Sequence, residues 1–280
     1  MNTQGRSGDY FSFQLNPLNF LGGITFLLFW ILLSTGSYLY LFYEMTPSGA
    51  YESVQNITIG QKYFGGIIRS IHRYSADGIL IVIVIHIFMQ FFSGRFRNHG
   101  RVAWTIGAMI LPVMWLEGVL GYFLVWDQAG QMIAETAAYL LDALLIHHGP
   151  MARNFLLDET KNGLLFFIFN YAHLGIPALL LLLAWAHCMR ISMPPIAPPR
   201  QVTIAILFAL FALAIFLPAT SLAPADLASR AVSPPIDWIF LAPFRLVRDF
   251  GLSPLIVWVG GGALYFVFFS LPWIFRNNQK

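Results

Sequence analysis

The sequence contains few charged residues. They make up only 10% of the 280 residues, whereas 58% of the residues are hydrophobic. A soluble domain has about 25% charged residues. So few charges cannot cover the surface of a soluble protein, so we expect much of this surface to face lipid.

Cysteine is nearly absent as well. The single Cys188 excludes intrachain disulfides, thiolate-bound iron–sulfur clusters and zinc sites built from several cysteines. We interpret Cys188 as a small apolar residue that fills space. No segment has the signature of a nucleic-acid-binding protein, so we expect no nucleic-acid partner.

Long apolar runs are abundant, and a membrane-spanning helix needs about 20 of such residues. The first run is too long for the hydrophobic part of a cleaved signal, so we expect it to be a true span. The predicted fold is therefore an all-α integral membrane protein with six spans. These spans are expected near 20–43, 76–93, 104–126, 163–189, 202–219 and 251–275.

The loop charges predict the orientation of these spans. Positive residues concentrate in cytoplasmic connections of membrane proteins. If both termini are cytoplasmic, segments 127–162 and 220–250 lie outside, and the protein belongs in the inner (plasma) membrane of a bacterium. The basic residues on the inner side are Arg95, Arg97, Arg101, Arg190, Arg200, Arg276 and Lys280.

Two pairs of histidines carry the strongest functional signal. His72 and His86 are 14 residues apart, as are His173 and His187. On a helix, 14 residues fall roughly 40° short of four turns and rise about 21 Å, so both histidines of a pair lie on one face at two depths. The second and fourth spans run in the same direction, because one span separates them. His72 is thus expected to meet His173 at the outer level, and His86 to meet His187 at the inner level. This arrangement suits two b-type haems, each held between two imidazoles.

The same spacing recurs among glycines. Gly22 and Gly36 are 14 residues apart in the first span, and Gly107 and Gly121 are 14 apart in the third. Glycine leaves room for a flat macrocycle between helices. Ordinary close packing of helices is the alternative reading.

Two arginines lie where haem propionates would need cations. Arg69 precedes His72 by three residues, and Arg190 follows His187 by three. We predict that Arg69 serves the outer haem and Arg190 the inner one. Anchoring at the membrane interface is the alternative for both.

At these residues the chain resembles cytochrome b of the quinol-oxidising bc and bf complexes. The resemblance covers roughly residues 16–250. It rests on the following segments: Leu21–Thr25, Thr35-Gly36, Ile68–Arg73, Trp104–Gly107, Gly121–Leu124 and Trp126–Gln128. It implies that residues 1–195 form a di-haem four-helix bundle and that residues 196–280 form a two-helix part. That is the two bf polypeptides joined, without the last helix of the second.

The tail resembles the family segment that carries a Pro-Glu-Trp-Tyr motif in the outer quinol pocket. Asp237 stands where the family glutamate takes a proton from quinol, with Ile236 in place of the proline and Ile239 in place of the tyrosine. The resemblance makes Asp237 the candidate catalytic residue. The alternative is an acid that starts a helix in a surface loop.

Two other features bear on the cofactors. The bf form attaches a third haem through a cysteine where this chain has Phe20, so we expect no covalent third haem. His147 and His148 lie together in the acidic outer loop, and we interpret them as solvated residues because no second pair of ligands accompanies them.

The resemblance implies a cytochrome b subunit that transfers electrons between quinol or quinone and a partner across the bilayer, as part of an oxidoreductase complex. The expected partners are membrane lipid, quinone, an iron–sulfur protein or a c-type cytochrome on the outer side, and a second copy of the complex. The altered outer motif leaves an alternative open, namely a di-haem membrane anchor that links an outer dehydrogenase or reductase to the quinone pool. A non-redox structural subunit is a third class.

Overall fold

The computed structural model describes residues 16–61, 64–144, 159–191, 196–232, 237 and 239–275. Within these ranges the chain is helical apart from its connections and one isolated bridge between Asp127 and Pro224. The α-helices are α1 (Leu21–Tyr40), α2 (Ala50–Gln55), α3 (Gly65–Phe92), α4 (Arg101–Val125), α5 (Gln128–Asp142), α7 (Glu159–Cys188), α8 (Arg200–Phe216), α9 (Ala242–Arg248) and α10 (Pro254–Ile274). Short 3₁₀ turns at Pro17–Phe20 and Asn98–Gly100 and a π-helical turn at Asn56–Gly60 complete the helical segments.

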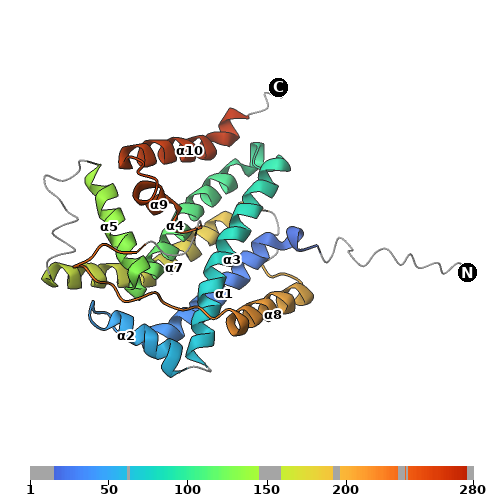
Figure 1. Ribbon diagram of the computed structural model, residues 1–280. Helices are drawn as coiled ribbons and strands as arrows, with labels where there is room; N and C mark the ends of the chain where they lie inside the picture. The colour runs from blue at the N-terminus through green and yellow to red at the C-terminus, as the bar shows by residue number, and fades with distance from the viewer. Residues whose placement is uncertain are drawn as a thin grey trace, which may run out of the picture.

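Four long helices form the centre of the molecule as two pairs. Helix α1 packs along α3, and α4 packs along α7 (Figure 1). Helix α8 lies against α3, while α10 contacts α4, α5 and α9. The histidine-bearing helices α3 and α7 thus belong to different pairs, so a site between them joins the two halves of the bundle.

The structure confirms an all-α membrane fold. Five of the described helical segments are long and apolar enough to cross a bilayer: Pro17–Tyr40, Gly65–Phe92, Arg101–Val125, Phe166–Cys188 and Pro254–Ile274. The remaining predicted span, 202–219, corresponds to α8, which is apolar but has only 17 residues. A span needs about 17–25 residues. The six-span topology and the position of the termini therefore stay predictions.

The start of the second span was predicted wrongly. Helix α3 begins at Gly65, not near residue 76. The additional turns contain Arg69, His72 and Arg73, whose polarity conceals a span in the sequence. Their side chains have partners from distant parts of the chain, so these turns stay helical despite their charges.

The junction after α4 ties two connecting segments together. Trp126 ends α4 in the left-handed conformation (φ 52°), and Asp127 then caps α5 by accepting from the N–H groups of Ala129 and Gly130. The other carboxylate oxygen of Asp127 accepts from the N–H of Leu222 at 2.9 Å. The Trp126-Asp127 motif therefore turns the chain and holds the connection that follows α8.

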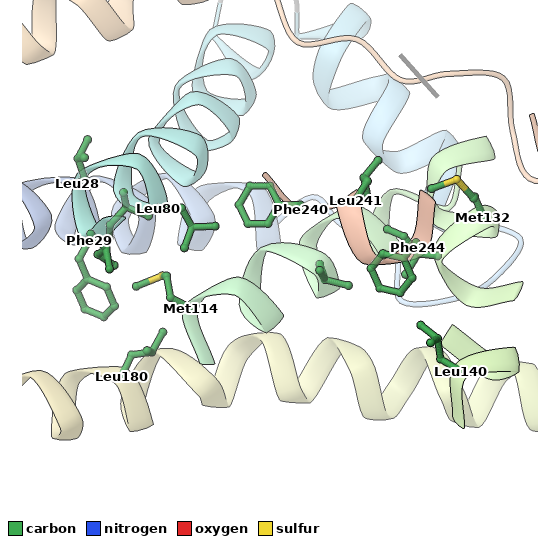
Figure 2. Close-up of a cluster of buried hydrophobic side chains, with 14 of the residues drawn as sticks. Leu28, Phe29, Leu80, Met114, Met132, Leu140, Leu180, Phe240, Leu241 and Phe244 are labelled. Atoms are coloured by element: carbon green, nitrogen blue, oxygen red, sulfur yellow. The ribbon is translucent and has the colours of Figure 1, made fainter. Parts of the chain in front are cut away.

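The predicted two-part organisation is not visible as two separate cores. One buried hydrophobic cluster includes Ile79 and Met114 from the first part and Leu210, Phe240 and Val247 from the second. Figure 2 shows Phe240, Leu241 and Phe244 seated among side chains of the other helices. The boundary at residue 195 stays a prediction, while the two parts share their packing.

Candidate functional site

The first candidate site lies between His72 of α3 and His173 of α7. The centroids of the two imidazoles are 6.5 Å apart, and the ring planes meet at 73°. Two metal–nitrogen bonds of about 2 Å, together with the two ring radii, add up to roughly 6 Å. The distance therefore fits one metal ion held axially between the two rings, as the histidine spacing predicts.

The second pair is His86 of α3 and His187 of α7. These residues lie 14 positions further along the same two helices and are close enough for their charges to interact. The structure thus brings the four predicted histidines together as two pairs at two depths. Among the residues that the structure describes, no group of three or more His, Cys, Asp or Glu could hold a metal. A macrocycle that supplies the remaining ligands fits such isolated pairs, whereas a site made of protein ligands alone does not.

The second ring nitrogen of three of these histidines has an acceptor. The Nδ1 atom of His72 lies 3.0 Å from Thr35 Oγ1, and that hydroxyl donates to the carbonyl of Ile31 at 2.6 Å. Because the hydroxyl has one proton, His72 Nδ1 must be the donor toward Thr35. His187 Nδ1 lies 2.8 Å from the carbonyl oxygen of Ala103. An imidazole fixed in this way presents its other nitrogen, Nε2, to a metal.

His173 has two acceptors at Nδ1. The carbonyl oxygen of Glu117 lies 3.2 Å away, and a carboxylate oxygen of the same residue lies 2.9 Å away. His173 is therefore held by both the backbone and the side chain of a single α4 residue. Its Nε2 is then also available to a metal.

Three of the four paired glycines face the ring of a predicted histidine ligand. A Cβ at Gly36 would lie 3.0 Å from the ring of His72, one at Gly121 would lie 3.3 Å from His173, and one at Gly107 would lie 3.2 Å from His187. These glycines make room for the histidine of the neighbouring helix. A Cβ at Gly22 would meet no atom within 4 Å. The role of all four glycines beside a macrocycle stays a prediction.

Arg69 connects the start of α3 to other segments. Its guanidinium donates to Thr58 Oγ1 at 2.6 Å, to Ser221 Oγ at 2.8 Å and to the carbonyl of Ala219 at 3.5 Å. Arg190 lies just beyond α7 and is exposed. The role of either arginine at a propionate stays a prediction, and the contacts of Arg69 show an additional structural role.

Asp237 belongs to a polar cluster beside α3 and α4. Its Oδ2 accepts from Arg73 at 2.7 Å and from the hydroxyl of Tyr122, while its Oδ1 accepts from the N–H groups of Ile239 and Phe240. Arg73 also pairs with Asp77, one turn further along α3. The Asp237 side chain is only 13% exposed. The carboxylate therefore lies within this cluster, and its catalytic role stays a prediction.

The sequence analysis did not single out Glu117, Arg73 or Asp77 as candidate site residues. All three are ionisable residues inside apolar spans, and such residues are costly in a membrane and usually functional. Glu117 is the only acidic residue between Arg101 and Val125, so a search for isolated charges within spans would have found it. His147 and His148 lie outside the described residues.

Comparisons with known proteins agree with this geometry. The family model described as "Cytochrome b/b6/petB" matches residues 6–194. The cytochrome b6 of Synechococcus elongatus is 34% identical over 157 residues, which cover 56% of this chain and 70% of that protein. The cytochrome b6 of Auxenochlorella protothecoides is 32% identical over the same length, with the same coverage of both chains.

A solved structure, described as "Hyperthermophilic respiratory Complex III", has the same fold. It superposes with a TM-score of 0.73 at 20% sequence identity and covers 91% of this chain and 75% of that chain. The matched family segment contains all four paired histidines and extends over α1, α3, α4 and α7. The chain is an integral membrane protein that belongs to the cytochrome b/b6 family.

Proposed function

We propose that the chain is a di-haem electron-transfer cytochrome, with one haem between His72 and His173 at the outer level and one between His86 and His187 at the inner level. The facing of His72 and His173 at 6.5 Å carries this proposal. Membership in a haem-b-binding family supports it.

The protein's own residues provide orientation and basicity. Haem ligated by two imidazoles supplies one-electron transfer without an open coordination position for a substrate. Thr35, Glu117 and Ala103 hold His72, His173 and His187 through Nδ1, which fixes the tautomer and strengthens each imidazole as a ligand. The levels are about 21 Å apart along the helices, so an electron that passes between them crosses most of the hydrocarbon core.

The ligand assignment is tested by removing one histidine. His72→Ala is expected to lower the haem content of the purified protein from two per chain to one, measured by the pyridine haemochrome spectrum. His99→Ala is the matched control, because His99 is exposed on the connection between α3 and α4. Two haems retained in His72→Ala would refute the assignment.

We further propose that the chain is the cytochrome b subunit of a bc-like quinol oxidoreductase, with Asp237 in its outer quinol pocket. The resemblance of the tail to the family motif supports this, as does the low exposure of Asp237 beside α3 and α4. In this role Asp237 would accept a proton from quinol after leaving Arg73. An iron–sulfur protein or a c-type cytochrome on the outer side would accept electrons, and the complex would form a homodimer.

One observation favours the alternative of a di-haem membrane anchor. The carboxylate of Asp237 already accepts from Arg73, Tyr122 and two backbone N–H groups, as a purely structural residue would. In an anchor, an outer dehydrogenase or reductase would exchange electrons with the outer haem, and quinone would react near the inner one.

Quinol turnover by the purified complex separates the two. A bc-like enzyme should lose at least tenfold in turnover when Asp237 is replaced by Asn, and an inhibitor of the outer quinol pocket should block haem reduction. Asp226→Asn is the control, because Asp226 is an exposed acid of the outer segment. Full turnover in Asp237→Asn, with haem reduction that ignores the inhibitor, would favour the anchor.

A further inference from the structure

Glu117 places a carboxylate against one histidine inside the membrane-spanning bundle. Its Oε1 lies 2.9 Å from His173 Nδ1, and its side chain is only 13% exposed. The residue lies on α4 well inside the span Arg101–Val125. A carboxylate at this depth is costly, so its retention calls for a specific role.

The inner level of the same helix provides an internal comparison. Ala103 precedes Glu117 by 14 residues, and its carbonyl accepts from His187 as the carbonyl of Glu117 does from His173. Gly107 and Gly121 each follow four residues later and receive the rings of the same two histidines. Helix α4 therefore places a backbone carbonyl and a glycine against a histidine at both levels, but only the outer level adds a carboxylate. The backbone carbonyl alone suffices to hold a histidine, so the carboxylate is not needed for position alone.

The second carboxylate oxygen strengthens this reading. Among the described residues, Glu117 Oε2 is buried and has no hydrogen-bond partner. A carboxylate that served to brace the helices would be expected to bond with both oxygens, because an unmet buried acceptor is unfavourable. Within the described contacts, the Glu117 side chain is directed at His173 alone.

We propose that Glu117, acting through His173, lowers the reduction potential of the outer haem relative to the inner one. The inference rests on the proposed ligation by His173. When its Nδ1–H donates to a carboxylate, an imidazole becomes a stronger electron donor to the metal, and the negative charge lies nearby. Both effects would stabilise ferric relative to ferrous iron, which corresponds to a lower reduction potential.

Glu117→Gln tests the proposal in the full chain. The amide keeps an acceptor oxygen for Nδ1–H but removes the charge, so a purely structural role is preserved. An anaerobic redox titration of the haem absorbance is expected to show an equilibrium constant for reduction of the outer haem about tenfold higher, which is a rise of roughly 59 mV for one electron. The inner haem should be unchanged. Two intact haems with an unchanged outer potential would overturn the proposal.

The reciprocal variant tests the same idea at the inner level. Ala103→Glu should lower the potential of the inner haem, whereas Ala103→Gln, of nearly the same size, should not. If Glu117→Gln fails to assemble the outer haem, this pair decides the question, and equal inner potentials in the two variants would overturn the proposal. The electron paramagnetic resonance spectrum of the ferric outer haem should also change in Glu117→Gln, because it reports ligand strength.

Failure of the ligand assignment gives a different result. If His173→Ala retains two haems, the proposed ligation is wrong, whatever the potentials of the Glu117 variants.

Discussion

At the scale of single residues, the paired histidines differ in the groups that contact their Nδ1 atoms. Three different kinds of acceptor meet their Nδ1 atoms: the Thr35 hydroxyl at His72, the Ala103 carbonyl at His187, and the carbonyl and carboxylate of Glu117 at His173. The proposed ligands themselves are all histidines. The chain therefore sets different environments at its two levels through residues that would not touch the metal.

Thr35→Val removes the hydroxyl of Thr35 but keeps the shape of the side chain, so it tests the hydroxyl alone. The variant removes the Thr35 hydroxyl as an acceptor for His72 Nδ1–H. Because the carbonyl of Leu32 also lies within hydrogen-bonding reach of His72, the expected loss is about 0.5–1.5 kcal/mol. The potential of the outer haem should also rise, because His72 then donates less strongly. Redox titration and thermal unfolding in detergent measure both effects. Thr35→Ser keeps the hydroxyl and is the control, and identical behaviour of Val and Ser would contradict the prediction.

At the scale of elements, the segment that leads into α9 is wedged against α4. Phe240 is 1% exposed, its ring lies 5.9 Å from that of Tyr122, and Phe244 stacks on Trp115 at 6.0 Å. At Gly118 of α4, an added Cβ would overlap the Phe240 ring. Helix α9 also contacts α5 and the segment that precedes it, because Arg248 lies 3.6 Å from Glu135 and donates to the carbonyl of Ala231. Burial lowers the pKa of Arg248, with Glu135 acting in the opposite direction.

Gly118→Ala should therefore destabilise the protein, although alanine has the higher helix propensity. Alanine normally stabilises a helix interior by about 1 kcal/mol relative to glycine. Here we expect the variant to be destabilised by about 1–3 kcal/mol through overpacking. Adding Phe240→Leu should relieve the clash, so the double variant should lose less stability than the sum of the single variants, measured by thermal unfolding.

Gly175→Ala is the control for this experiment. Gly175 is exposed on α7, and a Cβ there meets no atom within 4 Å. Strict additivity of Gly118→Ala and Phe240→Leu would show that the two positions do not share a contact.

At the scale of the whole molecule, the central question is whether α8 crosses the membrane. Its 17 residues are near the lower limit for a span. If α8 crosses, the connections before and after it lie on opposite sides of the membrane. If it does not, both lie on one side and the orientation of α10 is reversed.

Cysteine labelling settles this point, because the chain has a single cysteine to remove. In a Cys188→Ser background, Ala197→Cys is expected to react with an impermeant maleimide only after the spheroplasts are broken, which exposes the cytoplasmic face. Ala228→Cys should react in intact spheroplasts with an impermeant maleimide. Both positions are exposed in the structure. Labelling of both from the same side would rule out the six-span topology.

The sequence predicts the spans and the histidine pairs because both depend on local periodicity. The ends of α1, α4 and α10 lie within about three residues of the prediction, since apolar runs end where polar loops begin. The start of α3 and the contacts of Asp237 could not be predicted. The Asp237 partners Arg73 and Tyr122 are 164 and 115 residues away in sequence, and no periodicity connects them. The glycine spacing was recognised, but its meaning at three of the four positions required knowing which ring each glycine faces.

The difference between the two levels of α4 has a consequence for energy conversion. A respiring bacterium is electrically negative inside, so an electron that moves from the outer to the inner level works against the membrane voltage, at about 2.3 kcal/mol per 100 mV. If haems occupy both levels as proposed, a carboxylate at the outer level and none at the inner level favour movement of an electron inward. Glu117 would then raise the membrane voltage against which electrons can still move inward.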